Sequence, residues 1–529
     1  MKTSLLIGSG AAAAGAAAAL LEDPTQRVLV LDVGNRLEAD LEATRVRLAQ
    51  SREEDWMDAD IQRIARLPDA ARSGGLPQKR SYGSNFPFSD VGQLDGVAAA
   101  EGTNGSVVSG AYGGFSNLWG AQIMPFSRAT FDRWPVSYAE MEQHYRFAQR
   151  EMSLAADRDD LVDLFPLPNE HHALPPLDER TEAVLKRYTL ARASLQSRGI
   201  TVGRARLALQ ADMCTRCAMC MTGCPYGLIY SASQSFDRLR PHARLDYRSN
   251  LLVFRVEQNS GAPRVLAREL RTGETMVFEA DRVFIGCGAI GSTRLVLGSR
   301  ARLKRPVAMA ESAQFVVPTV SMHAVRDPRD ERRFTLNQFN LLYDASGDGR
   351  DLCQIHFYPY NELFLRALPH VLQRPATRTL TKALLRRLSV GLGYLPSWRS
   401  PPVTVTAYAR GAEELPGLSI CGSERSGWPP MLKRFVAQLL RAAPSLDLWP
   451  ILPSTTLSGP AKSYHFGSSF PHHEVRSATT TDRLGRLEGW DRVHLIDAAV
   501  FPDVPATTFT LTVMANAHRI AAETLRLAE

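Results

Sequence analysis

Residues 1–32 contain a glycine-rich turn between two apolar segments. A short apolar run, residues 3–7, leads into Gly8, Gly10 and Ala13, which follow the spacing G-x-G-x-x-A and open an alanine-rich stretch. A strand, a tight turn and a helix in this order are typical of the phosphate-binding unit of dinucleotide-binding folds. Gly8 allows the turn, Gly10 lets the backbone approach a pyrophosphate, and Ala13 keeps the helix close to the strand. The sequence therefore predicts a Rossmann-type α/β unit at this end of the chain.

A second apolar run, residues 27–31, ends at Asp32. An acidic residue at the end of the second strand is placed to bind a ribose hydroxyl of the dinucleotide. The motif alone leaves the choice between NAD and FAD open. Two other interpretations compete for this segment. One is a purely structural Ala- and Gly-rich helix, and the other is a secretory signal, which also combines a basic residue, an apolar run and small residues.

Composition restricts the class of protein. The chain has 529 residues, of which 44% are hydrophobic, and this suffices for two or more domains with ample cores. The net charge of +7 is small for this length, and the basic residues are scattered among acidic ones, so we expect no nucleic-acid partner. Seven cysteines, odd in number and clustered, do not resemble a disulfide framework; they favour a reducing compartment or a metal.

Three further segments carry recognisable motifs. Residues 110–145 contain a Gly-rich stretch followed by WPVSY, residues 284–299 read FIGCGAIGSTRLVLGS, and residues 494–521 contain DAAVFP and end in RIA. In this order they resemble the flavin-covering segment, the signature and the C-terminal block of the glucose–methanol–choline (GMC) oxidoreductases, with Thr293 in place of the usual proline. The resemblance spans nearly the whole chain, and it implies FAD rather than NAD.

The resemblance also implies the fold and the cofactor contacts. The expected fold is α/β, with a Rossmann-type FAD-binding domain interleaved with an α+β substrate domain built on an antiparallel sheet. We expect FAD-binding parts at residues 1–130, 206–310 and 456–529, and substrate or cap parts at 131–205 and 311–455. The residues expected at the cofactor are Gly8, Gly10, Ala13, Asp32, Gly113, Gly114, Asn117, Asp497 and Ala498.

The segment 463–473 occupies the place of the family's catalytic histidine. The resemblance implies that His465 is the general base, which removes the hydroxyl proton of an alcohol while a hydride leaves its carbon for flavin N5. His472 and His473 are close rivals in sequence. The family's second active-site position, usually His or Asn, aligns with Thr508, whose hydroxyl can donate a hydrogen bond but cannot act as a second base.

Four cysteines lie together in the predicted loop 212–228. They are Cys214, Cys217, Cys220 and Cys224, and the spacing C-x2-C-x2-C-x3-C-P is that of bacterial ferredoxins. This favours an iron–sulfur cluster, either [4Fe–4S] or, without Cys224, [3Fe–4S]. Structural zinc, disulfides and free thiols are the alternatives. Some bacterial sugar dehydrogenases of the family carry a similar insertion. That resemblance implies that electrons leave the flavin through the cluster to an external acceptor, such as a cytochrome or a small subunit.

Alternating segments in the second half of the chain predict an antiparallel sheet over the flavin. These segments are residues 315–325, 353–360 and 402–410. Residues 366–410, which include the last of these segments, contain basic side chains and no Asp or Glu. Within this tract, Leu380, Leu384 and Leu388 recur at helical spacing. This pattern predicts a basic amphipathic helix that contacts a membrane surface. The alternatives are a docking face for a partner or polyanion, and the solvated face of an ordinary core helix.

Taken together, these features predict an FAD-dependent dehydrogenase. It would oxidise a CH–OH group of a sugar, polyol or other alcohol and pass the electrons to an external acceptor. Two alternatives are a flavoprotein of the same fold with non-oxidative chemistry and an electron-transfer module whose alcohol site is degenerate. Cluster assembly favours the cytoplasm, with peripheral attachment at the membrane through the basic tract; export to the periplasm with a signal-bearing partner is the alternative.

Overall fold

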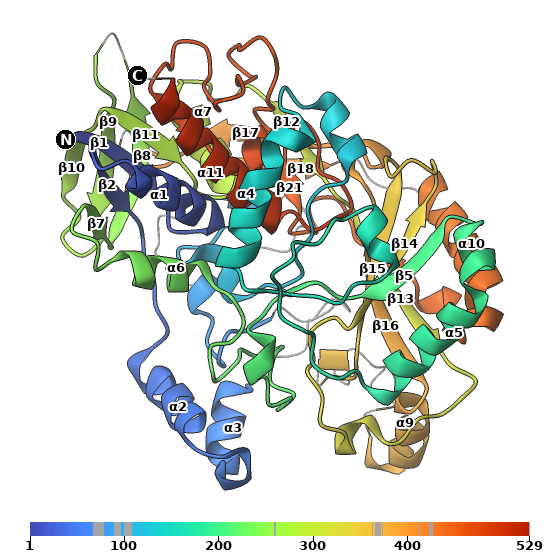
Figure 1. Ribbon diagram of the computed structural model, residues 1–529. Coiled ribbons are helices and arrows are strands. Elements are labelled where there is room, and N and C mark those ends of the chain that lie inside the picture. The colour runs from blue at the N-terminus through green and yellow to red at the C-terminus, as the bar shows by residue number, and fades with distance from the viewer. Residues whose placement is uncertain are drawn as a thin grey trace.

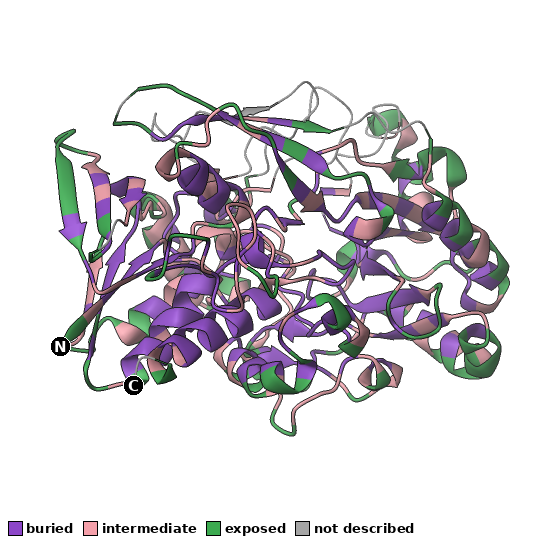
Figure 2. Cartoon of the chain, turned by 90° about the horizontal axis from the view of Figure 1, so that it is seen from above, coloured by how far each residue is buried: buried purple, intermediate pink, exposed green. Residues whose placement is uncertain are grey.

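The computed structural model describes residues 1–66, 79–88, 97–99, 108–258, 261–361, 363–364, 372, 374–411, 413–422 and 427–527. The chain forms two parts that lie side by side, one around a parallel sheet and one around an antiparallel sheet, and both termini lie at the parallel-sheet end (Figure 1). Buried residues concentrate in the interior of both parts (Figure 2).

The parallel sheet has five strands in the order β22-β11-β1-β2-β7. Their bounds are Val493–Leu495 (β22), Arg282–Ile285 (β11), Lys2–Ile7 (β1), Gln26–Leu31 (β2) and Leu245–Arg248 (β7). Because helices and loops cover both faces of such a sheet, its strands are apolar almost throughout; Leu5, Leu6 and Val30, for example, are fully buried. The expected turn, helix and second strand near the N-terminus are confirmed. The domain boundaries drawn from the sequence remain predictions.

Three helices pack together beside this sheet. They are α1 (Ala11–Glu22), α4 (Tyr138–Glu151) and α11 (Thr510–Arg526). The small residues of α1 let α11 approach closely: a Cβ added at Gly15 would lie 2.5 Å from the carbonyl oxygen of Met514. The alanine-rich stretch is therefore a packing surface for the last helix as well as the opening of the nucleotide-binding unit.

Other elements complete the parallel-sheet part and its neighbourhood. An antiparallel sheet of β8 (Leu251–Glu257), β9 (Arg264–Glu269) and β10 (Thr275–Glu279) lies beside helix α7 (Ala289–Ser299), and helix α6 (Ala232–Leu239) lies next to α1. Helices α2 (Ala39–Gln50) and α3 (Asp58–Ile64) form an arm that projects at the bottom of Figure 1. A strand pair, β4 (Leu154–Ala155) and β6 (Leu207–Ala208), joins the two parts of the chain around residues 150–210.

The second part is built on an antiparallel sheet in the order β19-β13-β16-β15-β14-β5, with β20 paired to β13. The bounds are Trp449–Pro450 (β19), Gln314–Val320 (β13), Leu388–Tyr394 (β16), Leu352–Tyr358 (β15), Phe339–Asp344 (β14), Ile200–Arg204 (β5) and Thr456–Leu457 (β20). One face packs under α5 (Glu179–Gln196) and α10 (Pro430–Leu446) through residues such as Phe315, Ile355 and Phe435. Since side chains alternate along a strand, the intervening residues point to the opposite face.

A five-stranded sheet in the order β21-β12-β17-β18-β3 lies next to it. Its bounds are Phe466–Gly467 (β21), Val307–Glu311 (β12), Val403–Tyr408 (β17), Gly417–Gly422 (β18) and Val97–Ala99 (β3). The strand predicted at 402–410 is β17, so it lies in this sheet, whereas the strands predicted at 315–325 and 353–360 are β13 and β15 of the other one.

The helix predicted from Leu380, Leu384 and Leu388 is wrong beyond residue 385. Helix α9 spans only Arg378–Leu385, and Leu388–Tyr394 is strand β16. The strand is favoured because residues 388–394 also alternate, and Gly393 leaves room for Phe315: an added Cβ there would lie 2.2 Å from that ring. Arg366 lies outside the described residues.

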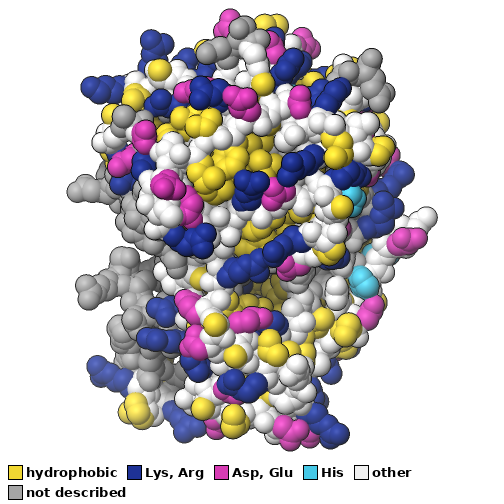
Figure 3. Space-filling model, turned by 90° about the vertical axis from the view of Figure 1, so that its left-hand side faces the viewer, with side chains coloured by type: hydrophobic (Ala, Val, Ile, Leu, Met, Phe, Trp, Pro, Cys, Tyr) yellow, Lys and Arg dark blue, Asp and Glu magenta, His cyan; other side chains and the backbone are white. Residues whose placement is uncertain are grey.

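The helix in the basic tract is therefore shorter than the one expected to contact a membrane surface. Among the described residues, no helix is long and apolar enough to cross a bilayer. On the face of the molecule shown in Figure 3, basic and acidic side chains are interspersed, and hydrophobic side chains gather in its hollowed middle.

Candidate active site

A cavity of about 820 Å³ connects the two parts of the molecule. Its walls include Gly8 and Asp32 from the ends of the parallel strands, and Tyr358, Tyr394 and His465 from the region of the antiparallel sheet. The ends of parallel strands are the usual place for a nucleotide in such sheets. The predicted nucleotide-binding residues and the predicted catalytic histidine therefore lie along one continuous space.

Two helices begin at glycines on this cavity. Gly10 is the N-cap of α1 and Gly288 is the N-cap of α7; neither helix end has a side-chain cap, and both glycines line the cavity. A Cβ added at either would meet no atom within 4 Å. Uncapped N–H groups and the positive end of the helix dipole favour an anion. The geometry fits a pyrophosphate between two helix N-termini.

Gly8 and Asp32 behave as the motif predicts. Gly8 has φ +97°, and a Cβ there would lie 2.8 Å from the carbonyl oxygen of Gly286. The Asp32 carboxylate accepts hydrogen bonds from Ser9 Oγ over 2.5 Å and from the Tyr247 hydroxyl over 2.8 Å. Burial raises the pKa of Asp32 to about 6. Asp32 also lines the cavity, where its carboxylate suits a ribose hydroxyl.

Ser9 connects this carboxylate to the segment that covers the cavity. Its Oγ accepts a hydrogen bond from the backbone N–H of Gly113 over 2.9 Å. Gly113 and Gly114 both adopt positive φ, 91° and 60°, and both line the cavity. A Cβ at Gly113 would lie 2.8 Å from the backbone nitrogen of Ser233, so glycine is required there. The two glycines let backbone form part of the wall, as expected for a flat ligand.

Asp497 lies on the opposite side of the predicted nucleotide end. Its carboxylate accepts hydrogen bonds from Ser292 Oγ over 2.5 Å and from the backbone N–H of Ala499 over 2.9 Å. Burial raises its pKa to about 6. Asp497 and Ala498 both line the cavity. Their position next to α7 supports the expected role beside the cofactor.

Two of the residues predicted at the cofactor, Ala13 and Asn117, lie outside the lining of the cavity. Ala13 is fully buried within α1. The amide of Asn117 donates to the carbonyl oxygens of Tyr112 over 3.0 Å and Gly114 over 2.8 Å. Neither residue lines the cavity. Asn117 therefore fixes the loop that carries the two glycines, and Ala13 keeps the helix packed.

His465 lies at the antiparallel-sheet end of the cavity. Its imidazole stacks on Tyr394, with ring centroids 4.2 Å apart and an interplanar angle of 12°, and meets Phe509 edge-on at 4.9 Å. Burial lowers the pKa of His465 to about 3. The imidazole is therefore neutral at physiological pH and able to accept a proton. Its Nδ1 is buried and has no hydrogen-bond partner among the described residues.

The backbone around His465 is held by two polar residues at the end of β12, Glu311 and Ser312. The buried carboxylate of Glu311 accepts hydrogen bonds from the N–H groups of Ala461 and Ser463, each over 3.0 Å. The carbonyl oxygen of His465 accepts a hydrogen bond from the N–H of Ser312 over 3.0 Å. These contacts fix the turn before β21, so the histidine is presented to the cavity by a rigid segment rather than by a free loop.

The rival candidates lie elsewhere. Thr508 does not line the cavity, and its hydroxyl donates to the carbonyl oxygen of Gln122 over 3.0 Å. His472 and His473 do not line it either. Nδ1 of His473 is 3.1 Å from the carbonyl oxygen of Val475. Of the four candidates, only His465 faces the cavity.

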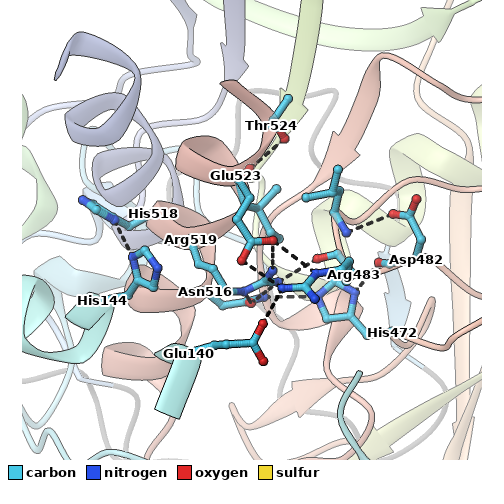
Figure 4. A network of polar contacts seen from close by, with 12 residues as sticks. Glu140, His144, His472, Asp482, Arg483, Asn516, His518, Arg519, Glu523 and Thr524 are labelled. Atoms are coloured by element: carbon cyan, nitrogen blue, oxygen red, sulfur yellow. Dashed lines mark hydrogen bonds and ion pairs between the residues drawn. The ribbon is translucent and has the colours of Figure 1, made fainter. Parts of the chain in front are cut away.

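His472 instead belongs to a buried polar network around α11 (Figure 4). Its Nδ1 donates to the carbonyl oxygen of Asp482 over 2.7 Å, and its Nε2 lies 3.3 Å from the amide nitrogen of Asn516. The same asparagine accepts from Arg519, which is fully buried and pairs with Glu523 over 3.1 Å. This network binds the loop at 472–483 to α11 and has a structural role.

Many cavity residues were not predicted as site residues from the sequence, among them Gln314, Tyr394 and Lys79. Gln314 donates to the Tyr394 hydroxyl over 3.1 Å. Lys79 donates to the carbonyl oxygen of Trp119 over 3.1 Å, and burial lowers its pKa to about 8. The alternation in residues 388–394 indicates a strand that ends at Tyr394, but the helical spacing of Leu380, Leu384 and Leu388 predicts a helix that runs into the same segment. Lys79 is one of many basic residues, and no motif distinguishes it.

The cysteine loop packs between the arm and residues 333–335, which precede β14. Trp56 meets Tyr226 with centroids 6.1 Å apart, the Tyr82 hydroxyl donates to the carbonyl oxygen of Cys224 over 2.9 Å, and the N–H of Thr335 donates to Cys220 Sγ over 3.3 Å. Met221, from the middle of the loop, lines the cavity. The loop is thus part of the wall around the candidate active site.

The cysteines themselves are free thiols in this structure. Burial raises the pKa of Cys217 to about 12 and that of Cys224 to about 11. In the part of the chain that is described, no three or more His, Cys, Asp or Glu side chains converge into a group that could hold a metal ion. The positions of the thiols in this structure therefore do not fit an iron–sulfur cluster, although the number of cysteines and their spacing in the sequence do.

Comparison with known proteins agrees on the fold. No protein-family model matches the chain, and no curated protein is significantly similar to it in sequence. Among solved structures, pyridoxine 4-oxidase from Mesorbium loti superposes with a TM-score of 0.58 at 14% sequence identity, over 99% of this chain and 99% of that one. At this identity the likeness shows the fold alone. The chain therefore has the predicted GMC-type fold, a Rossmann-type α/β domain interleaved with an antiparallel-sheet domain.

Proposed function

We propose that the protein is an FAD-dependent oxidoreductase that oxidises the CH–OH group of an alcohol. One observation carries the proposal: a single cavity has two uncapped helix N-termini and the carboxylate of Asp32 at one end, and a neutral histidine at the other. The first set suits a dinucleotide, and the second suits proton abstraction. The fold shared with an enzyme named an oxidase supports the same assignment.

When bound, FAD supplies a two-electron acceptor at flavin N5. The protein's own part is to orient the alcohol and take its proton. The hydroxyl proton of the alcohol would pass to His465 as its C=O bond forms, and bound FAD would accept the hydride that leaves the carbinol carbon. We assign the proton to Nε2 because Nδ1 is buried. Tyr394 and Phe509 hold the imidazole plane, and Glu311 and Ser312 hold its backbone.

The test is anaerobic reduction of the FAD-loaded protein by a panel of alcohols, followed by absorbance. His465→Ala should retain FAD and lose at least about 100-fold in the rate constant for flavin reduction, which is the usual scale for a general base. His473→Ala is the matched control and should reduce at the wild-type rate. Equal rates for wild type and His465→Ala would remove this residue from the mechanism.

We further propose that the electrons leave through an iron–sulfur cluster bound by Cys214, Cys217, Cys220 and Cys224. The ferredoxin spacing and the position of Met221 in the cavity wall support this. Binding requires the thiols to lose their protons and to converge further than they do here. Iron, sulfide and zinc assays on anaerobically purified protein test the proposal. About three or four irons per chain are expected; zinc, or no metal, would leave oxygen or a soluble acceptor as the electron sink.

A further inference from the structure

The wall opposite the nucleotide end is formed by one face of the antiparallel sheet. Val390, Leu392 and Tyr394 of β16 alternate toward the cavity, together with Tyr358 of β15 and Gln314 of β13. Two of these five side chains are aliphatic and two are aromatic. Gln314 and Tyr394 already bond to each other over 3.1 Å, so their polar groups are partly satisfied without a ligand.

Aromatic side chains continue this wall toward solvent. Tyr464, next to His465, is 42% exposed and lines the cavity, so it lies where the cavity opens. Its ring meets Phe115 at 6.0 Å, and Phe115 meets Phe88 at 5.7 Å. Trp119 and Phe509 also line the cavity. Flat apolar ligands pack well against rings arranged in this way.

The cavity has few charged side chains, and each of them is already bonded to another part of the protein. Among the described residues that line the cavity, the carboxylates are those of Asp32 and Asp497, both at the nucleotide end. The cationic side chains are Lys79, which donates to the Trp119 carbonyl oxygen, and Arg294, which is buried and donates to the Pro416 carbonyl oxygen over 2.5 Å. Each of the four charged groups already has a hydrogen-bond partner within the protein.

A polyol would be poorly matched to such a wall. Each hydroxyl buried without a hydrogen-bond partner loses its bonds to water and gains none, and a sugar brings several hydroxyls. Ligand pockets that bind apolar molecules have mostly hydrophobic and aromatic walls with a few polar groups that fix orientation. Here those polar groups are His465, the hydroxyls of Tyr358 and Tyr464, and the pair Gln314–Tyr394, which is already bonded to itself. They suffice to orient one carbinol group.

We infer that the substrate is a neutral alcohol whose carbinol carbon carries an aromatic ring, and not a sugar or polyol. The inference rests on the proposed function, since it names the substrate class of the same site. The ring lies against Val390, Leu392 and the aromatic residues, and the hydroxyl faces His465.

The experiment uses the FAD-loaded wild-type protein under anaerobic conditions. Benzyl alcohol and cinnamyl alcohol are compared with glucose and sorbitol as reductants, and benzamide, which has no carbinol carbon to oxidise, is titrated to see whether it perturbs the flavin spectrum. We expect the aromatic alcohols to reduce the flavin at least about 10-fold more efficiently than the polyols, and benzamide to compete with them.

Two variants test the wall. Leu392→Asn should weaken binding of benzamide and cinnamyl alcohol at least 10-fold, while the same change at Leu380, which is 60% exposed on α9, should have no effect. If Leu392→Asn does not fold, the nearly isosteric Val390→Thr should still raise the KM for cinnamyl alcohol about 3-fold or more.

The possible outcomes separate the two claims. Efficient reduction by glucose or sorbitol, but not by aromatic alcohols, would overturn the inference and uphold the proposed function. Competitive benzamide binding without reduction by any alcohol would uphold the aromatic site and overturn the proposed function. Absence of both binding and reduction would overturn both.

Discussion

The imidazole of His465 lies flat against the ring of Tyr394, at 4.2 Å and 12°. The two residues are far apart in sequence and meet only in the folded protein: His465 precedes β21, and Tyr394 is the last residue of β16. The contact restricts rotation of the imidazole, so the nitrogen that meets the substrate has a defined direction. Position matters as much as basicity for such a group.

Replacing Tyr394 tests this restriction. Tyr394→Ala should lower the rate constant for flavin reduction about 10- to 100-fold without loss of FAD, because the imidazole loses the surface that orients it. Tyr394→Phe keeps the ring and removes only the hydroxyl that accepts from Gln314, so it should stay within about 3-fold of wild type. Stopped-flow absorbance measures both. Equal losses in the two variants would assign the effect to the hydroxyl instead.

The pH profile of flavin reduction should lack the usual histidine transition. Burial lowers the pKa of His465 to about 3, against 6.5 for an ordinary histidine. The base is then neutral, and active, at every pH above that value. The rate constant should stay level from pH 8 down to pH 5, measured by stopped flow in buffers of constant ionic strength. A fall centred near pH 6.5 in wild type, absent from a slow His465→Gln variant, would contradict the lowered pKa.

Acid should weaken the fold through His472. Burial and the nearby charge of Arg519 hold its pKa well below 6.5 in the folded protein. Below pH 6.5 the unfolded chain binds a proton at this residue that the folded chain does not, so this contribution to the free energy of unfolding decreases as pH falls. Urea unfolding at pH 7.5 and pH 5.5 measures the change. His472→Gln should be less stable at pH 7.5 yet lose less on acidification, whereas His473→Gln should match wild type.

The same substitution at two glycines of α1 should have opposite effects. Gly10→Ala places its Cβ in open space within the cavity, so the protein should fold normally and bind FAD at least 10-fold more weakly. Gly15→Ala places its Cβ 2.5 Å from the Met514 carbonyl oxygen, and it should cost about 1–3 kcal/mol of stability as an overpacked core does. Thermal unfolding and FAD titration distinguish them. Normal FAD affinity in Gly10→Ala would place the pyrophosphate elsewhere.

Local patterns predicted the parts of this site that depend on a single segment. Gly8, Gly10 and Asp32 follow from one strand–turn–helix–strand unit, and all three line the cavity; their cofactor-binding roles stay predictions. The prediction of a helix at Leu388 was wrong because this short segment fits both the helical and the strand periodicity. The strand is favoured by the packing of Gly393 against Phe315, a residue far away in sequence. The roles of Glu311 and Lys79 could not be predicted for a related reason. Each side chain bonds to backbone far away in sequence, Glu311 at residues 461 and 463 and Lys79 at residue 119, and no local pattern indicates these contacts.

The order of the strands has a consequence for how the protein is made. The parallel sheet begins with residues 2–31 but is completed by β22 at 493–495, and α1 is covered only when α11 has formed. A nascent chain therefore carries the glycine turn for almost the whole of its synthesis without a finished sheet behind it. Until residues 493–526 have been synthesised, the sheet lacks β22 and the apolar face of α1 has no α11 to cover it.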